Sequence, residues 1–355
     1  MAQFTGKLNS NTIFAALYNM IISQNVFSDN ISGGDDLVND NRVDGTLLGD
    51  TKLYYSTDAL YSSEWGNDAE ASNLLKLYRP EAPEVQSITL DNFRQIALTT
   101  DNYLTKQAFA DEGAFSSFNS VIKGWITDTK KIYDATTFNC FFGTTKTDIG
   151  NQDIKVNISG ITETGEAKDR KEAQLIAQTV ARTLKKVSDY SRDYNDYGNL
   201  RRYSKDDLTI VWNSAYVDKI TYIDLPTLYH KDILNFSNEL EARYFGDVIE
   251  TAGTSDGTKR SLVEQVVTNG TDSTHVFAGD LIPNGFKYNA YTAYTENGNI
   301  ICKIYKKGTI PFMSAFEVAT SFFNPKSLTE NNYLTWGHNT LEYLKNYPFI
   351  TIEAE

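Results

Sequence analysis

The side chains that could do acid–base or metal chemistry are few in this chain and lie far apart in the sequence. There are three histidines, His230, His275 and His338, and two cysteines, Cys140 and Cys302. None of them belongs to an H-x-x-x-H or C-x-x-C pattern, the kind of spacing at which such residues hold zinc. Both cysteines stand among apolar residues, which predicts buried, reduced thiols and synthesis in a reducing compartment.

Two short acidic runs could in principle bind a cation or act as paired carboxylates. Residues 40–45 faintly resemble a calcium loop, but an arginine stands at the third ligand position and Thr51 at the twelfth, where a bidentate glutamate belongs. Glu64, Asp68 and Glu70 form the second run, with no base beside them. We interpret the first run as a turn in solvent and the second as the polar tip of a hairpin.

The longer motifs that define common enzyme classes are absent from the sequence. It contains no G-x-S-x-G, no G-x-G-x-x-G and no G-x-x-x-x-G-K-[ST]. Residues 190–203 interleave tyrosines with arginines, as single-strand nucleic-acid binders do, but aspartates dilute the charge and a polar helix end with a loop explains the run better. We therefore predict no enzymatic activity, no metal and no cofactor.

The overall charge argues against wholesale binding of nucleic acid. The chain has 33 Lys and Arg against 46 Asp and Glu, a net charge of −13 at pH 7, and its pI is near 4.8. Such a chain cannot neutralise a phosphate backbone over its whole surface. The start has no basic segment followed by an apolar core, and no window approaches eighteen apolar residues, so we expect neither a signal peptide nor a membrane span.

The elements that would position these groups are dominated by one long apolar stripe within residues 113–142. Residues spaced three or four apart, as on one face of a helix, form it: Phe115, Phe118, Ile122, Trp125, Thr129, Ile132, Thr136 and Cys140. The stripe predicts one straight helix on the order of 40 Å long. We expect Phe118, Ile122, Trp125 and Ile132 to pack on a β-sheet, and truncation of Trp125 to cost roughly 3–5 kcal/mol.

The chain before this helix is too polar to form a core of its own. Residues 1–47 contain one apolar run, at 13–22, and residues 48–84 have the pattern of a long hairpin that projects from the body. Projecting hairpins are rarely stable alone, and exposed apolar groups so arranged mark interfaces. We therefore expect five side chains here to be buried against neighbouring chains: Phe14, Leu17, Trp65, Leu75 and Tyr78.

A second helix, a buried strand and a hairpin are predicted after the long helix. One face of the predicted helix carries Ala173, Ile176, Val180, Leu184 and Val187. The apolar run at 207–212 is bounded by charges, which is typical of a buried strand. Asn297 and Gly298 stand between alternating segments at 286–294 and 300–305, and this dipeptide predicts a two-stranded hairpin.

In this order of parts the chain resembles the major capsid proteins of tailed bacteriophages, which have the Hong Kong 97-like fold. Residues 204–213, followed by a predicted helix, resemble that family's central strand of the axial domain. Residues 336–344 and 347–350 resemble the closing segment of its peripheral domain. The resemblance implies an α+β subunit divided into an N-terminal arm (1–47), an extended loop (48–84), a peripheral domain with the spine helix (85–142), an axial domain (143–284) and a return to the peripheral domain (285–355).

The resemblance also implies a function and partners. The chain would be a structural protein that self-assembles, as hexamers and pentamers, into the icosahedral capsid shell around a phage double-stranded DNA genome. Separate scaffolding, portal or decoration proteins would be further partners, packaged DNA would be touched only non-specifically, and no membrane would be involved. The expected location is the virion, after assembly in the host cytoplasm. Lys52 and Lys76 lie in the extended loop, but no accepting Asn or assisting Glu is identified, so the family's isopeptide cross-link is not carried over.

Four other interpretations remain open at the level of sequence. A phage tail-tube or sheath subunit would have a dominant β-barrel and no long central helix. A non-catalytic glycan-binding module would suit the acidic, Tyr- and Trp-rich composition but needs no rod. An enzyme would require a catalytic constellation that the sequence lacks. A cellular nanocompartment shell would share the fold.

Overall fold

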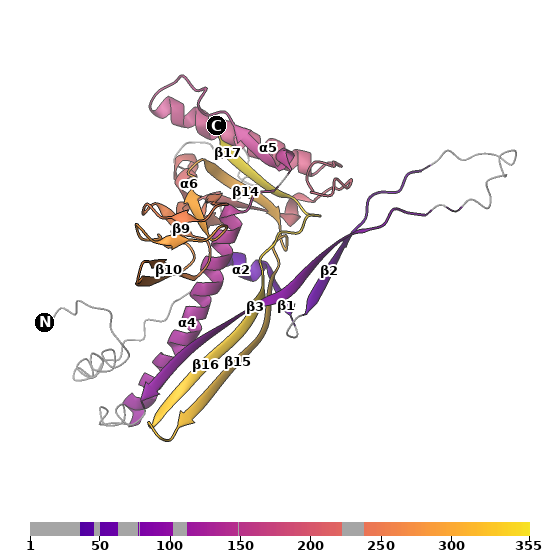
Figure 1. Cartoon of the computed structure of the whole chain (residues 1–355). Helices are drawn as coiled ribbons and strands as arrows, with labels where there is room; N and C mark the ends of the chain where they lie inside the picture. The colour runs from indigo at the N-terminus through magenta and orange to yellow at the C-terminus, as the bar shows by residue number, and fades with distance from the viewer. Residues whose placement is uncertain are drawn as a thin grey trace.

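One long helix crosses the molecule and organises the rest of it. The computed structural model describes residues 36–45, 50–62, 77, 79–101, 112–147, 149–221 and 238–355. Helix α4, Glu112–Thr144, is flanked by a long sheet along its first half and by a more compact body around its second half (Figure 1). Among the described helices, none is long and apolar enough to cross a membrane. The five predicted interface residues, Phe14, Leu17, Trp65, Leu75 and Tyr78, lie outside the described residues.

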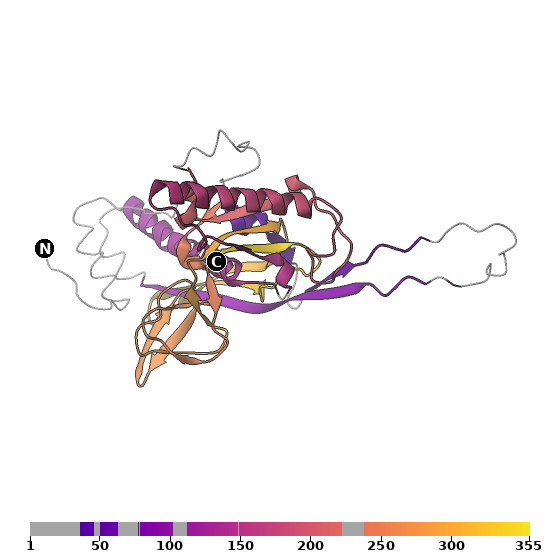
Figure 2. The same cartoon turned by 90° about the horizontal axis from the view of Figure 1, so that it is seen from above.

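The sheet beside α4 joins segments from both ends of the chain. Its strand order is β1-β15-β16-β3-β2, with β15, β16 and β3 antiparallel and β1 parallel to β15. Only the first six residues of β3 pair with β2, so these two strands leave the body as a ribbon (Figures 1 and 2). The strands are β1 (Arg42–Gly45), β2 (Thr51–Ser56), β3 (Glu84–Asp101), β15 (Phe312–Asn324) and β16 (Thr329–Asn339).

Helix α4 is the predicted spine, but it meets the sheet through a different face from the one expected. It runs unbroken for 33 residues, about 50 Å. Ile126 and Tyr133 are buried against the sheet, whereas Trp125 is 44% exposed and Ile132 is 39% exposed. The prediction that Trp125 and Ile132 pack on the sheet is therefore wrong. The side chains of Phe118 and Ile122 lie outside the described part of the structure.

The physical reason for this error is that the sheet-facing row of α4 is partly polar. Between Ile126 and Tyr133 it contains Lys130, which is buried and whose Nζ lies 3.2 Å from Asp134 Oδ2. Lys130 Nζ also lies 3.3 Å from Glu317 Oε2 on β15. Because these ion pairs let a lysine lie on the covered face, a search for apolar spacing selects the neighbouring row instead.

The apolar stripe suggests that truncation of Trp125 costs more stability than truncation of its neighbour Ile126. The structure predicts the reverse order. Ile126→Ala should lower the free energy of unfolding by about 2–4 kcal/mol, because it removes buried methyl groups between helix and sheet. Trp125→Ala should cost less, since its half-exposed ring leaves no internal cavity. Urea unfolding of the protein measures both values, and a larger loss for Trp125→Ala would contradict this packing.

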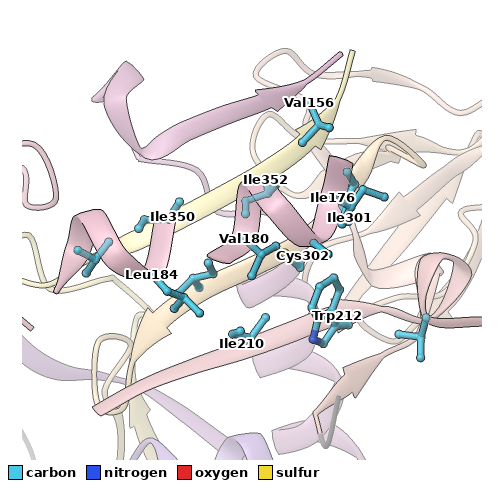
Figure 3. Packing of buried hydrophobic residues seen from close by; sticks show 14 of the residues in the cluster. Val156, Ile176, Val180, Leu184, Ile210, Trp212, Ile301, Cys302, Ile350 and Ile352 are labelled. Atoms are coloured by element: carbon cyan, nitrogen blue, oxygen red, sulfur yellow. The ribbon is translucent and has the colours of Figure 1, made fainter. Parts of the chain in front are cut away.

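A second five-stranded sheet forms the centre of the body. Helix α5, Glu166–Val187, covers one face of it, and its predicted apolar row is buried as expected (Figure 3). Phe138 and Phe142 of α4 pack with Tyr305 and Phe349 in a second cluster beside the sheet. The strand order is β4 (Asp153–Val156), β17 (Phe349–Ala354), β14 (Ile300–Lys306), β5 (Leu208–Asn213) and β6 (Glu239–Leu240). The predicted buried strand is β5.

Two small sheets and several short helices complete the body. One sheet has the order β11-β10-β12-β8 and the other β7-β13-β9. Their strands are β7 (Gly246–Val248), β8 (Gly253–Thr254), β9 (Lys259–Ser261), β10 (Gln265–Asn269), β11 (Asp272–Val276), β12 (Lys287–Tyr288) and β13 (Ala293–Glu296). The short helices are α2 (Asp36–Asp40), α6 (Ser214–Thr221), η2 (Gly150–Gln152), η3 (Lys205–Asp207) and η5 (Ala242–Tyr244).

The predicted hairpin at Asn297 is wrong, although a turn is present. The carbonyl of Asn297 accepts a hydrogen bond from the Ile300 amide at 3.4 Å. However, β13 pairs with β7 and β9, while β14 pairs with β17 and β5. The Asn297 side chain donates to Asp247 Oδ2 at 2.7 Å, which holds the turn on β7. The turn thus carries the chain from one sheet to another instead of folding it back.

Candidate assembly interface

The histidines do not form a reactive site within the described residues. His275 Nε2 lies 2.9 Å from Glu264 Oε1, and His338 is buried with its Nε2 2.7 Å from the Tyr133 hydroxyl. Burial lowers the pKa of His338, so it is held as a neutral structural ring. No group of three or more potential metal ligands occurs in the described ranges, and His230 lies outside them.

Both cysteines are buried and unpaired, as the sequence predicts. Cys140 lies inside α4 and Cys302 lies on β14, and neither has an exposed surface. Burial raises the pKa of the Cys140 thiol to about 12 and raises that of Cys302 as well. Because the thiolate is the reactive species, we expect both buried thiols to react slowly with thiol reagents in the folded protein.

Residues 40–45, interpreted above as a turn in solvent, have a structural role instead. Asp40 is the last residue of α2, and β1 begins two residues later, at Arg42. Asn41 is buried, donates to Leu37 O at 2.8 Å and accepts from the Gly308 amide at 2.9 Å. The interpretation as a solvated turn is therefore wrong. Glu64, Asp68 and Glu70 lie outside the described residues.

The projecting ribbon is held at its base by the loop that follows α5. The carboxylate of Asp58 accepts from the Leu200 amide at 2.8 Å, from Arg192 Nη1 at 2.6 Å and from the Ala59 amide at 2.8 Å. The Leu200 amide contributes most, followed by Arg192, in lowering the pKa of Asp58 to about 2. Arg201 also donates to the carbonyl of Thr57.

Buried amides extend this contact along the β2 side of the ribbon. Asn199 Nδ2 donates to Ser56 Oγ at 2.8 Å, and both side chains are buried. Asn199 is itself fixed by Asn195, whose Nδ2 donates to its carbonyl at 2.7 Å and whose Oδ1 accepts from its amide at 2.8 Å. Fixed partners of this kind leave the end of β2 little freedom to pivot.

The β3 side of the ribbon is held by the segment that leads into β17. Gln86 donates from Nε2 to the carbonyl of Tyr343 at 3.0 Å and accepts at Oε1 from the Lys345 amide at 3.0 Å. The Tyr343 hydroxyl donates to Asp196 Oδ2 at 2.5 Å, which connects this support to the loop after α5. We call the contacts of Asp58, Ser56 and Gln86 the base clamp.

An apolar face of the ribbon stands exposed along its paired strands, beside the base clamp. Tyr55 lies opposite Val85 in the antiparallel register, and Leu53 shares their face two residues away. All three side chains are exposed. Leu60, Tyr61 and Leu77 continue this apolar character away from the body. Apolar side chains directed into solvent on a supported arm can bind another protein surface.

The sequence held a partial signal for this site. The hairpin pattern at 48–84 located β2, but the residues of β3 that pair with it, 84–89, begin only where that segment ends. The aromatic and basic run at 190–203 is the loop expected after a helix. Its role as the support of the ribbon was missed, because partners such as Asp58 and Arg192 stand 134 positions apart. Nothing in either local pattern indicates that the two segments meet.

Removal of the Asp58 carboxylate should loosen the ribbon without unfolding the body. Asp58→Ala leaves the Leu200 amide and the Arg192 guanidinium without their acceptor, so the Leu200 amide should exchange with deuterium faster. Since the folded pKa of Asp58 is lowered to about 2, the protection should persist at pH 4 and be lost as the pH falls through about 2.

Hydrogen exchange followed by mass spectrometry measures this prediction. The matched control is Glu81→Gln, which removes a carboxylate from an exposed position next to the ribbon's other strand. Equal protection of the segment around Leu200 in all three proteins would contradict the base clamp.

Comparison with solved structures places the fold among phage capsid structures. A chain in "Capsid structure of Staphylococcus phage Andhra" is 9% identical, with a TM-score of 0.64 over 93% of this chain and 87% of that chain. A chain in "Structure of head fiber and inner core protein gp22 of native bacteriophage P68" is 11% identical, with a TM-score of 0.61 over the same shares. No model of a protein family matches, and no curated protein matches either.

These likenesses establish the fold and agree with the resemblance in the sequence. The protein is a mixed α+β protein with the capsid-type fold, built on a long helix, a long sheet beside it and a projecting ribbon. The tail-tube or sheath alternative requires the absence of a long central helix, and α4 is such a helix. At identities of 9% and 11%, these likenesses establish the fold only. The function has to be inferred from the residues of this chain.

Proposed function

We propose that this protein is the structural subunit of an icosahedral phage capsid shell that encloses a double-stranded DNA genome. The observation that carries the proposal is the capsid-type fold over 93% of the chain. The base clamp and the exposed apolar face of the ribbon support it. Apolar side chains that a fixed arm holds in water are stabilised when another protein surface covers them.

Self-association is the central partner relation in this proposal. Hexamers and pentamers of one chain repeat the same contacts around symmetry axes, so each patch must complement another patch on the same chain. Leu53, Tyr55 and Val85 contribute the described part of that surface. The arm and loop residues proposed to be buried against neighbouring copies are Phe14, Leu17, Trp65, Leu75 and Tyr78.

We propose that the arm, extended loop, peripheral domain, axial domain and return segment follow one another along the chain in this order. β14 and β17, which belong to residues 285–355, pair in the central sheet with β5 and β4. The return segment therefore contributes to both the central sheet and the long sheet. Separate scaffolding, portal or decoration proteins would be additional partners.

A structural role without catalysis fits this account. The net charge of −13 keeps long-range contact with packaged DNA repulsive, so we propose that DNA is held by confinement and touched only non-specifically. The proposed location is the virion capsid, after assembly in the host cytoplasm. A nanocompartment shell shares the fold and would differ in its contents.

Light scattering of the purified full-length chain tests the proposal. After removal of chelatable metal, the chain, alone or with a co-expressed scaffolding protein, should form particles of one narrow size class that hold DNA weakly at low salt. Many copies of one weak contact would then add up to a stable shell. A stable monomer under both conditions would contradict the proposal and favour the glycan-binding alternative.

A further inference from the structure

An apolar row lies on the outer side of α4, away from the sheet. It contains Trp125, Thr129, Ile132 and Thr136, of which Trp125 and Ile132 are large and exposed. Thr129 Oγ1 donates to the carbonyl of Trp125 at 2.7 Å, and Thr136 Oγ1 donates to that of Ile132 at 2.7 Å. Because both hydroxyls are bonded inside the helix, an apolar partner could cover the row without stranding a polar group.

The row matches one segment of the chain in length and in character. Residues 125 to 136 span about 16 Å of helix. Residues 13–22 contain no charged side chain, and as a helix they would be about 15 Å long. Phe14, Leu17 and Ile21 are spaced as on one helical face, so the segment would present a matching apolar stripe.

We propose that the apolar row of α4 is the docking site for residues 13–22 of a second copy of this chain. Phe14 and Leu17 of one copy would cover Trp125 and Ile132 of the next. The inference rests on the proposed function, because it requires that copies assemble. It also assigns a partner surface to the two arm residues that were proposed only to be buried against a neighbour.

The attachment of the arm favours a second copy over the same copy. Residue 36 begins α2, whose Leu37 and Val38 are buried in one cluster with Phe138 of α4. Immediately after α2, Arg42 Nη2 lies 3.7 Å from Asp134 Oδ2. Asp134 stands nine residues after Trp125, which is half a turn around the helix. The arm therefore joins its own subunit on the side of α4 opposite to the apolar row.

Paired cysteine substitutions test the docking directly in assembled full-length particles. The native Cys140 and Cys302 are fully buried, so added thiols report without background. We expect a short bis-maleimide to join copies covalently in particles that carry Leu17→Cys with Trp125→Cys. Leu17→Cys with Ile132→Cys is a second pair, and both α4 positions are exposed enough to accept the change.

The matched control is Leu17→Cys with Thr127→Cys. Thr127 is also exposed, but it lies about 160° around α4 from Trp125. The expected result is a ladder of linked copies on a denaturing gel for both test pairs and a loss of that ladder for the control pair. Particles that form normally with no link at either test pair, or links confined within single chains, would overturn the docking and leave the shell proposal standing. Failure of the unmodified chain to form particles would overturn both.

Discussion

Deletion of residues 63–72 is expected to leave a folded subunit that forms no closed particles. The segment contains none of the residues of the base clamp, so its loss should leave the contacts of Asp58 and Gln86 with the body intact. It removes Trp65, one of the residues proposed to be buried against a neighbour. Circular dichroism should be unchanged, while size-exclusion chromatography should show the loss of the particle fraction.

A replacement of equal length separates the effect of reach from that of side chains. If residues 63–72 are exchanged for a Gly/Ser segment of the same length, the ribbon keeps its span but loses its apolar and acidic groups. We expect this variant to assemble poorly too, because the contact depends on side-chain burial. Normal particles from the deleted protein would refute the role assigned to the extended loop.

At pH just above 10.5, where Lys303 is largely neutral in the unfolded chain too, its replacement by Met is expected to lower the free energy of unfolding by about 2–5 kcal/mol. Lys303 is fully buried on β14, and its Nζ donates to the carbonyls of Phe142 at 2.8 Å and Thr145 at 2.7 Å. The last carbonyls of a helix have no partner within it, so this lysine completes the end of α4 and ties it to the central sheet. Met fills a similar volume but donates no hydrogen bond.

The pH dependence of unfolding separates this role from simple packing. Burial lowers the pKa of Lys303 to about 7 from its ordinary 10.5. Between these values the unfolded chain carries the proton and the folded chain does not, so the Lys303 contribution to stability rises with pH from about 7 to 10.5. Lys303→Met should remove that rise, which urea unfolding at several pH values measures. Lys307→Met, at a largely exposed position, is the control. An unchanged slope in Lys303→Met would contradict the assignment.

The elements with a clear period could be predicted from the sequence, while their partners could not. The spacing of apolar residues located α4, α5 and β5, because helix faces and buried strands have local patterns. The face that α4 turns to the sheet was mistaken, since the buried Lys130 interrupts the covered row and Trp125 continues the exposed one. Apolar spacing alone does not distinguish a face covered within the subunit from one covered in an assembly.

Contacts between distant segments were likewise beyond local pattern. Asn297 and Gly298 make a turn, as their types predict, but the strands on either side belong to different sheets. The base clamp depends on Asp58 meeting Leu200, which are 142 positions apart. Tertiary pairing decides both cases, and a short window of sequence carries no information about it.

Negative-stain electron microscopy of the overexpressed full-length protein tests the central claim most directly. If the chain is a shell subunit, the images should show closed, isometric particles of uniform diameter, either from the chain alone or after co-expression with a scaffolding protein. Tubes built only of stacked rings, or single subunits under both conditions, would contradict the account.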